Sequence, residues 1–75
     1  MEYKELKIKE DYIKLDSALK FSSLVPTGGI AKMVILDGLV KVNGNICLQR
    51  GKKLYKGDKV EYDGKGFEIL WGLNP

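Results

Sequence analysis

The chain lacks histidine entirely and contains one cysteine and 2 prolines among its 75 residues. Without histidine, a Ser-His-Asp triad, a Cys-His pair and the usual zinc-ligand sets cannot be assembled. The single thiol, Cys47, has no partner for an internal disulfide and no imidazole to act as its base. No Walker-type phosphate loop is present either. We therefore expect a protein that is not an enzyme and that uses no metal or organic cofactor.

Long hydrophobic runs are also missing. The longest uncharged stretch, Phe21 to Ala31, is interrupted by serines, a proline and glycines, whereas a membrane-spanning helix needs about 20 apolar residues. The N-terminus is mixed in charge and lacks the apolar segment of a signal peptide. We expect a cytoplasmic protein without a membrane contact.

The material that is present suits one small globular domain over residues 1–75. Hydrophobic residues make up 44% of the chain, and a domain of this length buries about 60% of its unfolded surface. Residues 3–8 alternate between apolar and charged, which predicts a half-buried strand. A first helix is expected from about Leu15 to Ser22, with the carboxylate of Asp16 near the free N–H groups of its first turn.

A second helix of about ten residues is expected after Thr27, which suits the N-cap position. Gly38 suits its C-terminal stop, and Leu39 suits the apolar position that follows such a stop. The helical phase leaves two possible core faces, either Ala31, Val34 and Ile35 or Ile30, Met33 and Val34.

Residues 43–44, Asn-Gly, indicate a β-hairpin. A two-residue loop would pair Lys41 with Ile46 and place a charged and an apolar side chain on one face. A three-residue loop ending at Asn45 would instead pair Val42 with Ile46, and the apolar phase favours this register or an equivalent bulge.

Two further strands, residues 60–62 and 67–70, are expected to follow, joined by the turn at residues 63–66. Strands around a helical pair predict the α+β class. We expect three aromatic side chains in the core, namely Phe21, Phe67 and Trp71. Because this leaves no evident exposed aromatic for stacking on single-stranded bases, recognition of shape and backbone is favoured.

Basic residues are concentrated in the middle of the chain. Residues 14–59 hold nine basic against three acidic residues, a net charge of +6, and the remaining segments hold four against seven, a net charge of −3, which together give +3. A surface that binds a polyanion requires such a concentration, although a solvated lysine-rich surface has the same composition.

Four patterns follow one another between Leu15 and Asp58: Leu15-Asp16-x-x-Leu19-Lys20, Gly28-Gly29-x-Ala31-Lys32, Gly38-x-Val40-Lys41-Val42-Asn43-Gly44 and Gly57-Asp58. In this order they resemble the αL RNA-binding motif, the domain named after ribosomal small-subunit protein S-four. Gly28-Gly29 with Arg50-Gly51-Lys52-Lys53-Leu54 resembles the small stand-alone bacterial members of the YbcJ or YaaA type. The resemblance implies two short helices packed against a small, mostly antiparallel sheet. It also implies binding of structured RNA, such as ribosomal RNA or the ribosome, in ribosome assembly or translation.

Structured RNA is held mainly through its phosphates, by Lys and Arg side chains and by the N–H groups of helix N-termini. Gly28 and Gly29 would offer free N–H groups to a phosphate, and Asn43 would either stabilise its own turn or contact RNA. By resemblance, Lys14 and Lys20 flank the groove from the first helix. The full set of candidate RNA-binding residues is Lys14, Lys20, Thr27, Gly28, Gly29, Lys32, Lys41, Asn43, Arg50, Lys52 and Lys53.

The same residues are also consistent with other functions. Val42-Asn43-Gly44 and Leu54-x-x-Gly57-Asp58-x-Val60-Glu61 also look like segments of β-grasp sulfur carriers, which need a C-terminal Gly-Gly. This chain ends in residues 72–75, Gly-Leu-Asn-Pro, which supply no such site. A protein-interaction adaptor that presents its basic face to a protein is a second alternative. The protein itself is expected to be a monomer. DNA binding is a less favoured alternative, because neither helix carries the run of polar side chains that reading bases in the major groove requires.

Overall fold

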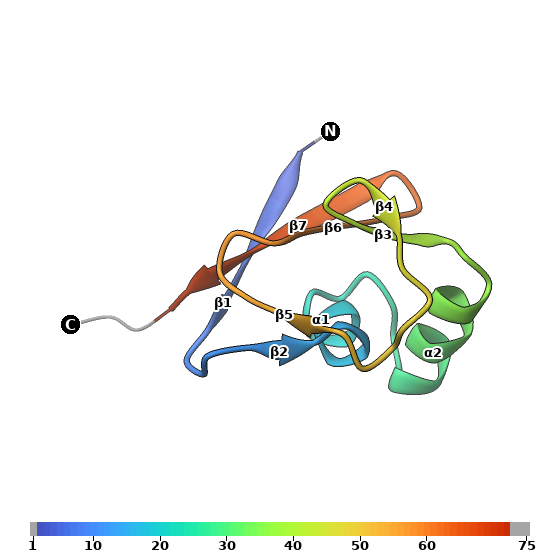
Figure 1. Ribbon diagram of the computed structural model, residues 1–75, viewed down its shortest axis with the longest axis horizontal. Helices are drawn as coiled ribbons and strands as arrows, with labels where there is room; N and C mark the ends of the chain where they lie inside the picture. Colours follow the sequence, from blue (N-terminus) through green and yellow to red (C-terminus); the bar gives the residue numbers. More distant parts are fainter. Residues whose placement is uncertain (1, 73–75) are drawn as a thin grey trace.

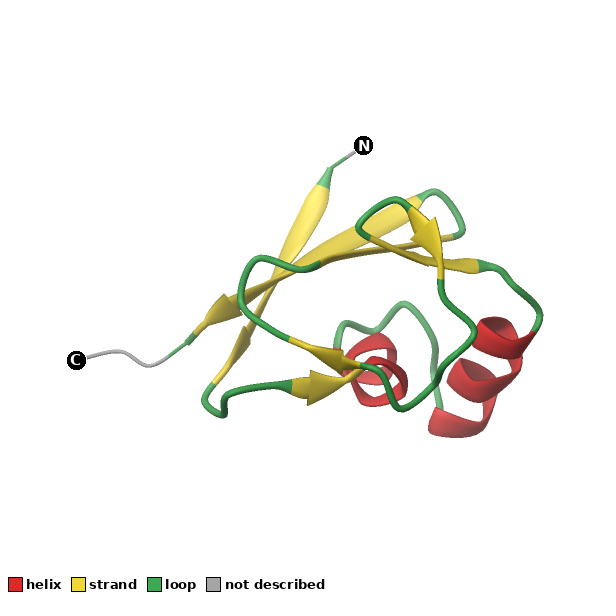
Figure 2. Ribbon diagram, in the orientation of Figure 1, coloured by secondary structure: helices red, strands yellow, loops and turns green. Residues whose placement is uncertain are grey.

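The computed structural model describes residues 2–72 and has two layers (Figure 1). One layer is a five-stranded sheet of order β1-β7-β6-β3-β4, and the other holds both helices and a two-stranded ribbon of β2 and β5 (Figure 2). The elements are β1 Tyr3–Ile8, β2 Ile13–Lys14, α1 Leu15–Phe21, α2 Gly28–Leu36, β3 Val40–Val42, β4 Asn45–Ile46, β5 Lys53–Leu54, β6 Lys59–Tyr62 and β7 Lys65–Trp71. The predicted α+β class is confirmed. Residues 73–75, part of the chain end considered for carrier chemistry, lie outside the described residues.

β7 lies between β1 and β6 in the large sheet. It pairs in parallel with β1, from Tyr3 opposite Gly66 to Ile8 opposite Trp71, and antiparallel with β6. Gly66 is buried under Tyr3, where an added Cβ would lie 2.6 Å from the tyrosine ring. The Tyr3 hydroxyl donates to the Glu61 carboxylate at 2.7 Å, and this hydrogen bond raises the pKa of Tyr3.

α2 begins and ends where its local chemistry predicts. The Oγ1 atom of Thr27 accepts the N–H of Ile30 at 3.2 Å, as an N-cap does. At the other end, Gly38 takes the left-handed conformation (φ 76°) and donates to Ile35, while Leu39 donates to Val34. This is a Schellman motif.

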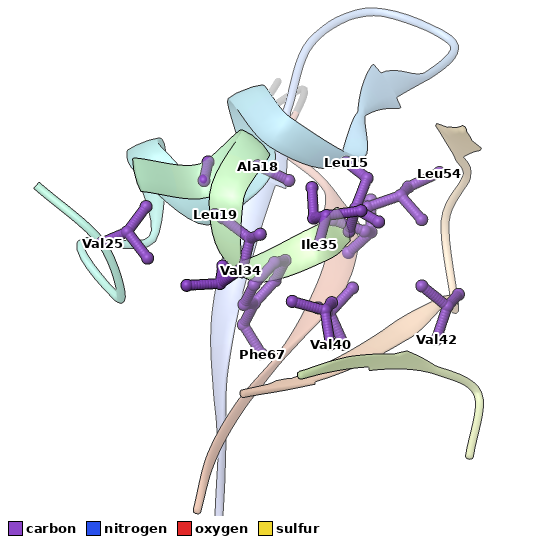
Figure 3. Close-up of a cluster of buried hydrophobic side chains, with 13 residues drawn as sticks. Leu15, Ala18, Leu19, Val25, Val34, Ile35, Val40, Val42, Leu54 and Phe67 are labelled. Atoms are coloured by element: carbon purple, nitrogen blue, oxygen red, sulfur yellow. The ribbon is translucent and has the colours of Figure 1, made fainter. Parts of the chain in front are cut away.

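Thirteen buried apolar side chains fill the space between the two layers (Figure 3). They are Leu15, Ala18, Leu19, Val25, Ala31, Val34, Ile35, Val40, Val42, Leu54, Val60, Phe67 and Ile69. Of the two phases considered for α2, the set that contains Ala31 and Ile35 is therefore the buried one. The two helices of the described part of the chain are too short to cross a membrane.

The preferred register of the β3–β4 hairpin is wrong. Lys41 lies opposite Ile46 and Val42 opposite Asn45, so the loop has two residues. Asn43 (φ 52°) and Gly44 (φ 87°) both take positive φ, as a type I′ turn requires. β4 is an edge strand and Ile46 is 60% exposed, so burial does not enforce the apolar phase there.

Two of the three aromatic residues assigned to the core are on the surface. Phe67 is fully buried, but Phe21 is 64% exposed and Trp71 is 55% exposed. Phe21 lies outside the buried stripe of α1, which is formed by Leu15, Ala18 and Leu19. Trp71 is the last residue of β7, and this end of β7 lies away from both helices (Figure 1).

Candidate nucleic-acid interface

Four candidate residues are brought together at the start of α1. The connection between β4 and β5 passes this helix end, where the N–H of Leu15 donates to the carbonyl of Lys52 (2.9 Å) and the N–H of Asp16 to that of Arg50 (3.1 Å). In the β2–β5 ribbon, Lys14 lies opposite Lys53. All four basic side chains are exposed. We call this set, Lys14, Arg50, Lys52 and Lys53, the basic strip.

The same hydrogen bonds determine whether the start of α1 has free N–H groups that could bind an anion. The first N–H groups of a helix are free unless another group accepts them. Here two of them are bonded to carbonyls of the basic strip, and the N–H of Ser17 donates to the Asp16 carboxylate at 2.7 Å. Attraction for a phosphate at this end of α1 must therefore come from the side-chain charges of the strip.

The start of α2 is a separate candidate, formed by Thr27, Gly28, Gly29 and Lys32, all of them exposed. The Thr27 side chain accepts the N–H of Ile30, so this N–H group of the first turn is not free for a phosphate. An added Cβ on Gly28 would meet nothing within 4 Å, and one on Gly29 would meet only the Thr27 hydroxyl at 3.9 Å. Neither glycine has a positive φ. Thus neither close packing nor a positive φ explains why glycine occupies these two positions.

Lys41 and Lys20 are not part of the basic strip. Lys41 is exposed between the buried Val40 and Val42, so it projects from the sheet face opposite the helices. Its neighbour on β6 is Glu61, whose negative charge reduces the positive potential there. Lys20 is exposed in the last turn of α1, at the helix end away from the strip.

Asn43 has a structural role. Its side-chain amide donates to the Asp58 carboxylate at 3.0 Å and its side-chain oxygen accepts the N–H of Lys59 at 2.9 Å. Asp58 in turn accepts the N–H of Tyr55 at 2.8 Å. The Asn43 side chain therefore joins the β3–β4 hairpin to the turn before β6, whereas the sequence interpretation expected it to stabilise its own turn or to contact RNA.

The sequence of this chain is similar to those of known proteins. A family model described as the S4 domain matches residues 6–70. This chain belongs to the S4 domain family. It is also similar to the probable ribosome maturation protein RlbA of Bacillus subtilis (strain 168), with 38% identity over 66 residues that cover 87% of this chain and 93% of that protein. The resemblance drawn from the motifs between Leu15 and Asp58 is thereby confirmed.

Aromatic side chains border the basic strip of this S4 domain, which the sequence interpretation missed. The ammonium group of Lys53 lies 4.8 Å from the ring centroid of Tyr12, within the range of a cation–π interaction. The Tyr12 ring is 6.1 Å from that of Tyr55, and the two rings are 37% and 49% exposed, respectively. The signal for these residues was weak, because Tyr12 and Tyr55 lie in irregular segments whose side-chain direction no periodicity fixes.

The described residues, 2–72, hold no group of three or more Cys, Asp or Glu side chains arranged to bind a metal ion. The three aspartates near the motifs have structural roles at helix ends and in a turn. Asp16 accepts an N–H in the first turn of α1, Asp37 is the C-cap of α2, and Asp58 closes the turn before β6. The chemistry that the interface offers is therefore charge and aromatic surface.

Proposed function

We propose that this S4 domain protein binds structured RNA through the basic strip, and that the RNA is ribosomal RNA during ribosome maturation. The protein acts as a binding module and not as an enzyme, as a monomer in the cytoplasm. Membership of the S4 domain family and the similarity to RlbA, a probable ribosome maturation protein, support this role.

The observation that carries the proposal is the fixed geometry of the basic strip. Backbone hydrogen bonds and the β2–β5 ribbon bring together the chain segments that carry the four exposed cationic residues. Like charges on neighbouring segments repel one another, and a row of RNA phosphates relieves that repulsion while releasing condensed counterions. Asp16, the nearest carboxylate in sequence to Lys14, already accepts a backbone N–H.

The start of α2 supplies a second phosphate contact in this proposal. Both the beginning of α2 and the loop that carries Arg50 and Lys52 lie on the side of the molecule away from the large sheet (Figure 1). Gly28 and Gly29 leave open space where a side chain would otherwise stand, and Lys32 follows one turn later. Lys20 is a peripheral contact, and Lys41, on the opposite face, contributes least.

A fluorescence anisotropy titration tests the proposal. Purified protein is titrated against a folded ribosomal RNA hairpin and against duplex DNA of equal length, over a series of salt concentrations. We expect preference for RNA and a log-log salt slope of about −4 to −7, as about five to eight phosphate contacts give. Equal, weak binding to both nucleic acids would contradict the proposal.

Charge reversal locates the site. Lys52→Glu keeps the Lys52 carbonyl that accepts from Leu15, so the fold should be unaffected while RNA affinity falls and the salt slope flattens by about 1. Lys65→Glu is the matched control, because Lys65 is also an exposed lysine but lies at the start of β7, outside the basic strip. Equal losses in the two variants would mean that net charge, and not the basic strip, determines binding.

A protein contact is a second candidate function. The outer side of α2 and the segments after it expose apolar side chains, namely Met33, Leu36, Leu39, Ile46 and Leu48, each more than half exposed. Contacts with a protein on a ribosomal particle would cover such a surface. Nuclease treatment separates the two candidates, since a particle contact made through RNA is lost on digestion and one made through protein is retained.

A further inference from the structure

A groove lies between the end of β1, the turn that follows it, β2 and α1. Its volume is about 590 Å³, within the range of about 300–1,000 Å³ that small-molecule sites occupy. Two half-buried side chains, Ile8 and Ile13, line it and pack against the core on their other side. Part of the groove is therefore formed by side chains that the fold holds in place.

Two aromatic side chains line the same groove. Phe21 is the last residue of α1 and is 64% exposed, and Tyr12 precedes β2 and is 37% exposed. The exposed phenyl ring of Phe21 takes no part in the core cluster, so the fold does not explain it. A flat apolar ring at the edge of a cationic site suits stacking with a nucleobase, because every base has a π-face.

The groove is cationic as well as aromatic. Three lysines and one glutamate line it, which gives a net charge of +2: Lys7, Lys9, Lys14 and Glu10. Lys7 and Lys9 come from the N-terminal segment, whose sequence outside residues 14–59 contributes to a net negative charge. The fold thus brings Lys7 and Lys9 into the cationic surface, which the charge distribution along the chain does not indicate. A nucleotide, with its flat base and charged phosphate, matches both parts of this lining.

The groove is continuous with the basic strip. Lys14 lines the groove and also lies opposite Lys53 in the β2–β5 ribbon. Lys53 in turn places its ammonium group 4.8 Å from the Tyr12 ring. An RNA strand whose phosphates contact the strip therefore passes the mouth of the groove.

From this arrangement we infer that the groove binds an unstacked base of the RNA, with Phe21 and Tyr12 as stacking surfaces and Lys7, Lys9 and Lys14 around the adjoining phosphates. The inference rests on the proposed RNA binding and specifies which feature of the RNA is recognised. The preferred RNA carries an unpaired nucleotide next to a helix, and a fully paired stem is a poorer ligand.

Two hairpins with the same stem test this inference. One carries a single bulged adenosine, and the other carries an abasic ribose at that position, so phosphate number and shape are matched. Wild-type protein should bind the adenosine hairpin at least about fivefold more tightly, the lower end of what stacking on an aromatic side chain gives. A fluorescent adenine analogue in the bulge should be quenched on binding.

Variants at Phe21 assign the effect to the groove. Phe21→Leu should reduce the difference between the two hairpins and the quenching, because only the Tyr12 ring remains, while Phe21→Tyr, which keeps a ring, should retain both. Leu36→Ala is the matched control, because Leu36 is the last residue of α2, is 56% exposed and does not line the groove. The melting temperature of each variant shows whether it is folded.

The outcomes separate this inference from the proposed function. Tight binding of both hairpins with no preference for the adenosine overturns the base site and leaves RNA binding through the basic strip intact. A preference that is undiminished in Phe21→Leu also overturns it. Failure to bind either hairpin, with Lys52→Glu indistinguishable from wild type, overturns the proposed function and the inference together.

Discussion

Replacing Asn43 by alanine should destabilise this S4 domain substantially and leave its affinity for RNA unchanged. Asn43 is exposed and lies in a motif that the family resemblance associates with RNA, so a contact with the ligand was a reasonable expectation. Both polar atoms of its side chain are nevertheless bonded to Asp58 and Lys59. The residue is therefore expected to act through the fold.

The magnitude follows from two contributions. Alanine removes two side-chain hydrogen bonds, each of which contributes about 0.5–1.5 kcal/mol net. It also places a residue with a Cβ at φ 52°, which costs about 1 kcal/mol because alanine lacks asparagine's tolerance of the left-handed conformation. The sum is about 2–4 kcal/mol, or a fall in melting temperature of roughly 8–30 °C for a domain of this size.

Thermal and denaturant unfolding followed by circular dichroism would measure this effect, with Asn43→Gly as the companion variant. Glycine loses the same hydrogen bonds but accepts positive φ, so it should be less destabilising than alanine by about 1 kcal/mol. RNA affinity is measured at a temperature at which all three proteins are folded. A variant that keeps its melting temperature and loses RNA binding would refute this reasoning and make Asn43 an RNA contact.

Three further predictions concern single positions. Gly66→Ala should lower the free energy of unfolding by about 1–3 kcal/mol, because the new Cβ would overlap the Tyr3 ring and approach the Val60 carbonyl at 3.0 Å. The hydrogen bond to Glu61 raises the pKa of Tyr3, so its stabilising effect is present below about pH 10 and is lost as pH rises through the folded-state pKa; unfolding experiments at increasing pH should show a loss in wild type that Tyr3→Phe lacks. Gly29→Ala should raise stability by up to about 1 kcal/mol, because alanine is the better helix former and its Cβ has room, and it should weaken RNA binding if a phosphate approaches the backbone there.

Each of these predictions has an outcome that contradicts it. An unchanged unfolding free energy in Gly66→Ala would mean that the Tyr3 ring moves aside at no cost. Parallel pH profiles for wild type and Tyr3→Phe would show that the hydrogen bond to Glu61 contributes no stability. Undiminished RNA affinity in Gly29→Ala would remove the start of α2 from the interface.

Local chemistry made the helices predictable. The cap at Thr27 and the stop at Gly38 depend on groups within a few residues, so the sequence indicates them directly. The hairpin register failed because the argument assumed that Ile46 must be buried, and an edge strand imposes no such condition. The β2–β5 ribbon was not predicted, since two-residue strands are too short to carry a periodic pattern.

The interface was predictable only in part, for a different reason. The charge concentration and the family motifs pointed to the residues of the basic strip, but their meeting point depends on long-range hydrogen bonds such as that from Leu15 to Lys52. Phe21 was assigned to the core by residue type, although the phase of α1 places it outside the buried stripe. Lys7 and Lys9 were missed because charge was counted along the chain and not in space.

The position of β7 between β1 and β6 has a consequence for how the protein is made. Tyr3 pairs with Gly66, so the first strand to leave the ribosome cannot form its pairing in the sheet until the last strand has been synthesised. Contacts of such sequence separation slow folding, because loop closure comes before any gain in pairing. Until β7 has been synthesised, β1 and β6 lack the strand that lies between them, and β1 has no partner in the sheet. We therefore expect the domain to fold only after Trp71 has emerged, and fragments that stop before β7 should be unfolded and prone to aggregation.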